Sequence, residues 1–248
     1  MTLEQFFAEN REVAIAFSGG VDSAYLLYAA TRYAARVKAY YVSTAFQPEF
    51  ELEDARRLAD ELGADMLVLR VDVLSNSAVT ANPSDRCYHC KNTLFRQILR
   101  AAENDGFPVL LDGTNASDDA GDRPGMRALR ELSVRSPLRE CGLTKAEIRR
   151  LSREAGLFTW DKPAYACLAT RIRTGEEITL QKLKQTEKAE GFLFGLGFRD
   201  FRVRMVDNTA KLELREADLP LLLENREKIV TELRKDYDSV LLNLEARK

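Results

Sequence analysis

The sequence predicts an α/β protein whose parallel sheet carries helices on both faces, followed by a small C-terminal α+β domain. In the first half, short apolar runs alternate with segments of helical spacing, which indicates βαβ units and a parallel sheet. Two polar segments, residues 18–20 (SGG) and 113–115 (GTN), directly follow two of these runs. After Gly175 the order changes to helix, strand, strand, helix, strand. Ligands of parallel sheets bind at the carboxyl ends of the strands, so both polar segments are candidate site positions.

The first predicted strand is an apolar run that ends at a glycine pair, and the next apolar positions share one helical face. Gly63 closes the second helix, as glycine commonly does after a helical C-terminus. The predicted strands are Val13–Phe17, Val37–Ser43, Met66–Val71 and Val109–Asp112, and the predicted helices are Val21–Tyr33, Glu51–Leu62 and Lys91–Asn104.

The second half begins with Ala116–Arg139, which is rich in Asp, Gly, Arg and Pro and is expected to be irregular. Thr144–Ala155 is expected to be helical, because Thr144 and Glu147 have the spacing of a capping box. Trp160–Gly175 is expected to be a second loop. The elements expected after it are the helix Leu180–Leu196, the strands Phe201–Val206 and Ala210–Arg215, the helix Leu219–Lys235 and the strand Ser239–Leu244.

The chain has 248 residues, enough for one or two domains, and the change of element order favours domains over residues 1–172 and 173–248. Apolar residues make up 45% and charged residues 31%, with a net charge of −2, which excludes a disordered chain. No apolar run approaches the about eighteen residues of a membrane span. The acidic N-terminus has no leader pattern, and four cysteines are too few for a disulfide scaffold, so we expect a cytoplasmic protein.

Positive charge is concentrated in one part of the chain. Residues 123–204 contain 18 Lys/Arg and 10 Asp/Glu, whereas the remainder is acidic. This excess indicates a site for an anionic small molecule at least as readily as a nucleic-acid surface. An unevenly charged, solvated surface is an equal alternative before any motif is considered.

Residues 18–23 (SGGVDS) are the strongest functional motif. A strand leads into two glycines and then into a helix start, where free N–H groups attract an anion. The glycines permit a tight bend and the close approach of a ligand. The motif is not a Walker loop, because the lysine of GxxxxGK[ST] is missing, and the chain has no complete GxGxxG. It predicts a phosphate-binding loop, with an ordinary strand-to-helix turn as the alternative.

The cysteines provide a second signal. Cys87 and Cys90 stand three positions apart, a spacing that suits a metal ion, a redox pair or two buried thiols. His89 between them is expected to be a loop residue and not a ligand. Cys167 has basic neighbours that favour its thiolate, whereas Cys141 is assigned a structural role.

The loop of residues 18–23 followed by a helix resembles the PP-loop ATP pyrophosphatases, which split ATP between its α- and β-phosphates and adenylate an acceptor oxygen. With four further segments in the same order, the chain resembles the LarE family over nearly its whole length. These segments are residues 86–91 (RCYHCK), 113–118 (GTNASD), 162–171 (KPAYACLATR) and 201–205 (FRVRM).

The resemblance implies a PP-loop (adenine nucleotide α-hydrolase-like) ATP pyrophosphatase domain over residues 1–172 and a substrate-binding domain over residues 173–248. It also implies that ATP and Mg²⁺ bind here, with Asp22 at the metal. The residues expected at the ATP and pyrophosphate are Ser18, Gly19, Gly20, Asp22, Ser23, Asn115, Asp118 and Arg171.

LarE proteins adenylate a carboxylate of pyridinium-3,5-biscarboxylic acid mononucleotide, and sulfur then replaces AMP to give the thiocarboxylic acid of nickel-pincer nucleotide biosynthesis. The resemblance puts Cys167 at the sulfur-donating cysteine, which in the sacrificial version becomes dehydroalanine. In members that add a CxxC, three cysteines are thought to hold a [4Fe-4S] cluster with an extra sulfide; here they would be Cys87, Cys90 and Cys167. We favour the cluster over the sacrificial version, and both over zinc.

Arg202 and Arg204 alternate along a predicted strand, so both guanidinium groups share one face. They are either a solvated pair or, as the resemblance implies, a clamp for the substrate's phosphate. Glu190 matches an acidic family position near that substrate, and Lys91 is assigned to offset charge on the acyl-adenylate. The residues expected to be catalytic are Cys167, Asp22 and Lys91.

Two other classes of function remain open on the sequence. One is another PP-loop enzyme, either a tRNA thiolase or an ATP-dependent amide-forming synthetase. The other is a non-catalytic nucleotide-binding domain with a zinc knuckle, which leaves Asp22 and the two arginines without a role. We expect the pyridinium mononucleotide as substrate, a homo-oligomer, and no stable partner among nucleic acids or membranes.

Overall fold

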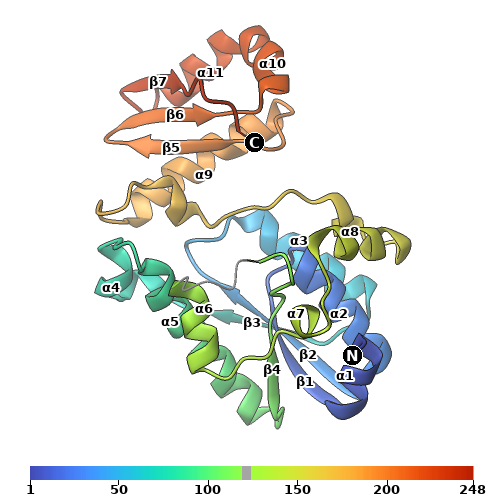
Figure 1. The fold of residues 1–248 in the computed structure, drawn as a ribbon. Helices are drawn as coiled ribbons and strands as arrows, with labels where there is room; N and C mark the ends of the chain where they lie inside the picture. Colours follow the sequence, from blue (N-terminus) through green and yellow to red (C-terminus); the bar gives the residue numbers. More distant parts are fainter. Residues whose placement is uncertain (119–123, 248) are drawn as a thin grey trace. The chain divides into compact units, whose positions relative to one another are not determined.

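The computed structural model describes residues 1–118 and 124–247. The chain forms two compact units (Figure 1), and each is built from two segments. The predicted boundary after residue 172 differs from this division, which falls after Tyr165 and assigns an earlier segment to the second unit. The first unit comprises Met1–Val73 and Asp85–Tyr165, and the second comprises Leu74–Ser84 and Ala166–Lys248.

The first unit contains a four-stranded parallel sheet in the order β3-β2-β1-β4. The sheet confirms the four predicted strands: the apolar runs of β1, β2 and β4 contain buried positions, whereas the edge strand β3 is half-buried or exposed along its length. Since β2 and β4 flank β1 on opposite sides, the strand order reverses between β1 and β4. The strands are β1 (Glu12–Phe17), β2 (Arg36–Ser43), β3 (Met66–Arg70) and β4 (Val109–Leu111).

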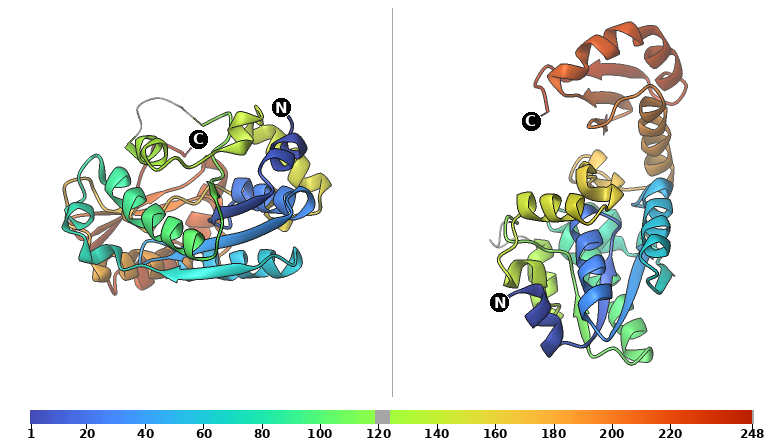
Figure 2. Two further views of the ribbon diagram at one scale, coloured as in Figure 1. Left: turned by 90° about the horizontal axis from the view of Figure 1, so that it is seen from below. Right: turned by 90° about the vertical axis from the view of Figure 1, so that its right-hand side faces the viewer.

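Helices cover both faces of this sheet (Figures 1 and 2). Right-handed crossovers from β1 to β2 and from β2 to β3 put α2 (Val21–Tyr33) and α3 (Glu49–Glu61) on one face. The return to β4 through α5 (Arg86–Asn104) puts that helix on the other. The apolar core of the first face also includes Phe6 and Phe7, whereas Ile98 and Ala102 of α5 pack on the second.

The remaining helices of the first unit are short. The N-terminal helix, which the sequence analysis did not predict, is held by a capping box between Thr2 and Gln5 and buries two phenylalanines. The predicted capping box of Thr144 and Glu147 is confirmed. These helices are α1 (Leu3–Glu9), α6 (Pro124–Glu131), α7 (Pro137–Glu140) and α8 (Lys145–Glu154), with the single 3₁₀ turn η2 (Phe158–Asp161).

Two predictions for the first unit are wrong. The stretch 116–139 contains α6 and α7, because proline favours the first helical turn and Ala128 and Leu129 are buried. Residues 119–123 of that stretch lie outside the described part of the chain. The helix expected from Lys91 begins at Arg86, so the CxxC motif is helical, and the predicted loop residue His89 pairs with Asp85 one turn earlier at 3.3 Å.

The second unit contains a three-stranded sheet in the order β5-β6-β7, with β5 antiparallel and β7 parallel to β6. The helix predicted over 219–235 is divided at Asn225, whose Nδ2 donates to the carbonyl of Leu221 at 3.0 Å. The elements are η1 (Val73–Ser75), whose first residue belongs to the first unit, α4 (Ser77–Thr80), η3 (Leu168–Arg171), α9 (Leu180–Gly195), β5 (Arg202–Val206), β6 (Thr209–Glu213), η4 (Glu216–Asp218), α10 (Leu219–Glu224), α11 (Arg226–Leu233) and β7 (Ser239–Leu242).

The early segment joins the second unit through Asn82, which is fully buried in a left-handed conformation with φ of 53°. Its Nδ2 donates to the carbonyl of Arg173 at 2.8 Å, and its own carbonyl accepts from the N–H of Gly175 at 2.8 Å. None of the helices in the described part of the chain is long and apolar enough to cross a membrane.

Candidate active site

The loop of residues 18–23 joins β1 to α2 at the edge where the strand order reverses. Gly19 has φ of 71°, a conformation that favours glycine. A Cβ at this position would also lie 3.2 Å from the Ala55 Cβ on α3, so both the backbone conformation and the close packing favour glycine here. Gly20 is the N-cap of α2, and no side chain in the described part of the chain caps this helix. The first N–H groups of α2 are therefore available to an anion.

The two serines of the loop hold each other. Ser18 Oγ lies 3.0 Å from Ser23 Oγ, which donates to the carbonyl of Gly20 at 3.2 Å. The backbone N–H of Ser18 donates to the same Ser23 hydroxyl at 3.3 Å. These contacts close the loop on itself and fix its conformation.

The segment after β4 packs on the start of α2. A Cβ on Gly113 would lie 2.9 Å from the backbone nitrogen of Ser23 and 3.2 Å from its Cα. Asn115 Nδ2 donates to Asp22 Oδ1 at 3.3 Å, and the Asn115 N–H donates to Asp118 Oδ2 at 2.8 Å. The two polar segments identified in the sequence therefore meet in one site.

Two lysines that the sequence analysis did not assign to this site lie beside the loop. Lys145 Nζ donates to Asp22 Oδ2 at 2.5 Å. Lys162 Nζ lies 2.7 Å from Asp54 Oδ2 on α3 and 3.5 Å from the carbonyl of Gly19. Lys145 directly follows the capping threonine of α8, and that position is the one sequence signal that would have identified it. Both ammonium groups add positive charge where a polyphosphate would bind.

A pocket of about 340 Å³ opens beside the segment after β4. Cys87 and Lys91 line it from α5, and Thr114 and Asp118 line it from the segment itself. Gly125, at the start of α6, leaves room for the Lys91 side chain. A Cβ on Gly125 would lie 3.2 Å from the Cδ and Cε atoms of Lys91. The pocket therefore brings together Cys87 and Lys91 of the motif at residues 86–91 and Asp118 of the motif at residues 113–118.

Cys87 and Cys90 lie on the first turn of α5, three positions apart, so their side chains share one helix face. Cys87 is exposed and Cys90 is half-buried. The pair offers two sulfur ligands of the kind that iron and zinc prefer. Within the described residues no group of three His, Cys, Asp or Glu side chains that could hold a metal ion is found, and the third predicted ligand, Cys167, belongs to the second unit.

Comparisons with known proteins agree with this geometry. The profile of the asparagine synthase family matches residues 4–119, which contain the loop and all four strands of the first sheet. A pyridinium-3,5-bisthiocarboxylic acid mononucleotide synthase from Lactiplantibacillus plantarum is 34% identical over 218 residues, which cover 87% of this chain and 79% of that protein. Because so much of the chain is covered, the likeness extends into both units.

The chain belongs to the LarE family of PP-loop proteins. An uncharacterized protein from Synechocystis is 40% identical over 215 residues, covering 86% of this chain and 80% of that protein. The tRNA-specific 2-thiouridylase MnmA from Thermotoga petrophila is 26% identical over 191 residues, covering 59% of this chain and 52% of the relative. Of these two relatives with a named activity, the synthase from Lactiplantibacillus plantarum matches more of the chain than MnmA does.

In the second unit of this LarE chain, Arg171 and Glu190 form a contact that the sequence analysis did not predict. Both side chains are buried and form a two-pronged ion pair, with Nε–Oε1 at 2.8 Å and Nη2–Oε2 at 3.0 Å. Glu190 Oε1 also accepts from the N–H of Val203 at 2.9 Å. In this structure each side chain neutralises the other, and the roles predicted for Arg171 at the nucleotide and for Glu190 near the substrate stay predictions.

The Arg171 guanidinium also holds the turn that carries Cys167. Its Nη1 donates to the carbonyl of Ala166 at 2.7 Å and to Thr170 Oγ1 at 2.9 Å. The Thr170 hydroxyl and N–H in turn donate to the carbonyl of Cys167 at 2.8 Å and 2.9 Å. The half-buried Cys167 therefore sits at the start of η3 on a turn fixed by hydrogen bonds.

The predicted arginine clamp divides into two arrangements. Arg204 Nε donates to Glu213 Oε1 at 2.7 Å and its Nη1 donates to the carbonyl of Thr170 at 2.6 Å. Arg202 is 7% exposed, and its Nη1 donates to the carbonyl of Phe201 at 2.6 Å and lies 3.9 Å from Asp200 Oδ1. Cys141 packs against the first unit's core, and burial raises the pKa of its thiol, which suits the structural role predicted for it.

Proposed function

We propose that this chain is an ATP-dependent sulfurtransferase acting on pyridinium-3,5-biscarboxylic acid mononucleotide. The observation that carries the proposal is the anion-binding loop closed against Gly113 and Asn115, with Lys145 beside it. The choice of substrate is supported by the relative from Lactiplantibacillus plantarum, which is named as the synthase of the corresponding bisthiocarboxylic acid mononucleotide and matches 87% of this chain. The product would be the thiocarboxylic acid used for the nickel-pincer nucleotide.

In the first step a substrate carboxylate oxygen attacks the α-phosphorus of ATP. The bond from that phosphorus to the oxygen bridging to the β-phosphate breaks, and pyrophosphate leaves with the electron pair. The N-terminal N–H groups of α2, at the end of the loop that Ser18 and Ser23 hold closed, stabilise the charge that develops on the leaving group. Lys145 and Lys162 add cations on its flank, and Lys91 lies in the adjoining pocket, where it would offset charge on the acyl-adenylate.

Asp22 is the residue that would hold Mg²⁺. Its carboxylate supplies the oxygen ligand that Mg²⁺ prefers, and Mg²⁺ commonly takes only one or two carboxylates together with substrate phosphates. When bound, the ion neutralises charge on the phosphates. Lys145 and Asn115 hold this carboxylate by its two oxygens, so the orientation of the Asp22 side chain is fixed.

In the second step sulfur attacks the acyl carbon and the carbon–oxygen bond to AMP breaks. In the sacrificial version the sulfur is that of Cys167, and removal of its Cα proton then breaks the Cβ–S bond, leaving dehydroalanine and the thiocarboxylate. In the cluster version a [4Fe-4S] group held by Cys87, Cys90 and Cys167 would supply a sulfide. The two sulfur ligands on the first turn of α5 fit that group, so we propose the cluster version.

Pyrophosphate release tests the adenylation step. The wild-type chain is expected to release pyrophosphate from ATP only when the pyridinium mononucleotide is present. Asp22→Ala is expected to lower the rate by about 100-fold or more, as loss of charge stabilisation does in other enzymes. Asp60→Ala on the exposed face of α3 is the matched control and should leave the rate unchanged.

Two outcomes of this assay contradict the proposal. Release that ignores the pyridinium mononucleotide would count against the substrate, and stimulation by tRNA instead would support the thiolase alternative, which the likeness to MnmA keeps open. A normal rate in Asp22→Ala would remove the loop from the mechanism.

Anaerobic purification followed by iron and sulfide assays tests the sulfur source. We expect a brown protein with about four iron atoms per chain, as a [4Fe-4S] cluster requires. Cys87→Ser should lose the iron, whereas Cys141→Ser should keep it. A colourless chain whose Cys167 loses the mass of H₂S during turnover would support the sacrificial version, and a colourless chain still active as Cys167→Ala would contradict both.

A further inference from the structure

The Lys162 ammonium group lies beside the loop of residues 18–23, but the segment that carries it is neither helix nor strand. Lys162 directly follows η2, and residues 162–165 have no regular secondary structure. Its Nζ lies 2.7 Å from Asp54 Oδ2 and 3.5 Å from the carbonyl of Gly19, and its side chain is 13% exposed. The place of this charge therefore depends on what holds the backbone after η2.

Arg149 on α8 holds that backbone. Its Nη1 donates to the carbonyl of Trp160 at 2.7 Å, and its Nη2 donates to the carbonyl of Lys162 at 2.8 Å. Carbonyls at the end of a helical turn lack partners within the turn, and the planar guanidinium group presents two donors in a fixed geometry. One side chain therefore ties α8 to the segment at the end of η2.

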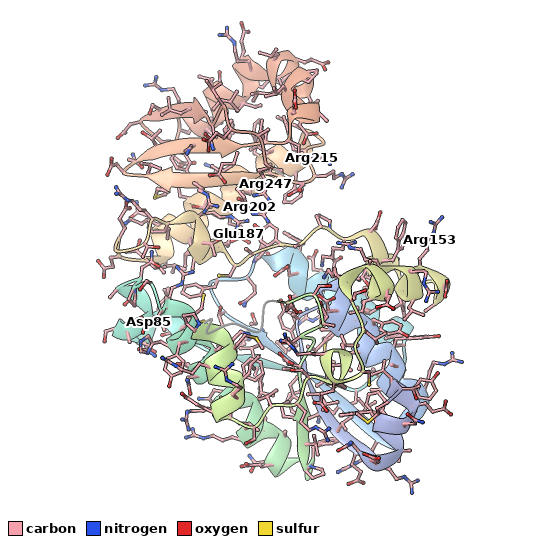
Figure 3. The ribbon with its side chains drawn as sticks, viewed as in Figure 1. Asp85, Arg153, Glu187, Arg202, Arg215 and Arg247 are labelled. Atoms are coloured by element: carbon pink, nitrogen blue, oxygen red, sulfur yellow. The ribbon has the colours of Figure 1, made fainter. Side chains whose placement is uncertain are left out.

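The helix that carries Arg149 is itself fixed in the core of the first unit. Ile148, the preceding residue, is fully buried in the apolar core that also contains residues of α2. Arg153, one turn further along α8 and labelled in Figure 3, has its Cζ 5.0 Å from the centroid of the Trp160 ring. Arg153 therefore contacts a ring of the segment, whereas Arg149 holds the backbone on which Lys162 depends.

We propose that Arg149 is a positioning residue of the ATP site, which sets the Lys162 ammonium group beside the loop. The inference rests on the proposed function and adds a residue that neither the motifs nor the resemblance indicated. Arg149 is half-buried, so water can replace its guanidinium group at both carbonyls when the side chain is removed. ATP binding would then have to order the segment and the Lys162 side chain, and it would be weaker for that reason.

Calorimetric titration of the full chain tests this role, with Mg²⁺ and an ATP analogue that has a methylene group between its α- and β-phosphates. Lys162→Ala is expected to weaken binding of the analogue by roughly 10-fold, the effect of losing one charge-assisted hydrogen bond. Arg149→Ala is expected to weaken it by about 3- to 10-fold, because the ammonium group remains but has to be ordered. Arg150→Ala is the matched control and should bind like the wild type, since Arg150 forms an exposed pair with Glu154 at 2.6 Å.

The double variant Arg149→Ala/Lys162→Ala separates positioning from a general structural role. If Arg149 acts through Lys162, the double variant should bind the analogue no more weakly than Lys162→Ala alone, because residues that act as one unit are not additive. A general loosening of the site would instead add to the loss. If Arg149→Ala fails to fold, Arg149→Lys takes its place, since lysine keeps the charge but lacks the two fixed donors of the guanidinium group.

The outcomes separate this role from the function on which it rests. Wild-type affinity in a folded Arg149→Ala, or losses that add in the double variant, would overturn the positioning role while the sulfurtransferase proposal stood. If binding of the analogue depended on Arg149 but pyrophosphate release ignored the pyridinium mononucleotide, the positioning role would stand and the substrate would be wrong. A wild-type chain that did not bind the analogue would overturn both.

Discussion

Glu190→Ala is expected to destabilise the second unit by about 3–5 kcal/mol, the typical cost of removing one partner from a buried ion pair. The Arg171 side chain is 0% exposed and the Glu190 side chain 2%, so water cannot replace the lost carboxylate. The N–H of Val203 on β5 loses its acceptor as well. Because the chain has two units, one unfolding transition does not report the stability of the second unit alone. The measurement is therefore hydrogen exchange of the backbone amides of β5 and β6, compared with the amides of the first unit.

Glu232→Ala is the matched control. Its partner Lys235 is largely exposed, so the loss is expected to stay below about 1 kcal/mol. The Cys167 turn provides a second measurement, because Arg171 holds it through Ala166 and Thr170. Alkylation of Cys167 is expected to be faster in Glu190→Ala, while that of the exposed Cys87 stays the same. Equal exchange rates in the variant and the wild type would contradict the assigned role of the pair.

Gly113→Ala is expected to lower mononucleotide-dependent pyrophosphate release by about 100-fold, the cost of a displacement near 1 Å in a catalytic site. The new Cβ would lie 2.9 Å from the Ser23 nitrogen, and a backbone atom at the start of α2 cannot move aside as a flexible side chain can. The segment after β4 would therefore move away from the loop, and Asn115 would lose its contact with Asp22. The rate and the affinity for ATP are the quantities to measure.

Gly191→Ala on α9 is the control for this substitution. No atom lies within 4 Å of its added Cβ among the described residues, and alanine in a helix is up to about 1 kcal/mol more favourable than glycine. The control should keep its activity and gain slightly in stability. If Gly113→Ala were as active as the wild type, the close packing of the two segments would have no part in the reaction.

The elements predicted from sequence and found in the structure are those whose signal is local. The strands β1 to β4 are apolar runs bounded by turn residues, and α2 begins and ends at the predicted residues. The loop of residues 18–23 was equally visible, because a strand, two glycines and a helix start follow one another directly. Arg86 differs: helix α5 extends back to it through polar residues that carry no apolar periodicity.

The residues that the sequence analysis missed or assigned differently depend on contacts between distant segments. Lys145 reaches Asp22 across 123 positions, and Lys162 reaches the carbonyl of Gly19 across 143. Neither distance leaves a pattern in a single sequence. The sequence analysis selected Arg171 and Glu190 as site residues, but their burial as a pair depends on how α9 packs against η3 and β5.

By itself the sequence determined the α/β class, the order of the strands along the chain and the strand–glycine–helix loop of residues 18–23. These features follow from the hydrophobic period and from the backbone freedom of glycine. Only the tertiary structure decided which charged side chains form ion pairs with each other. Arg171, for example, forms a buried ion pair and holds the Cys167 turn because packing brings Glu190 to it. That partner comes from another part of the chain, and burial sets the strength of the pair.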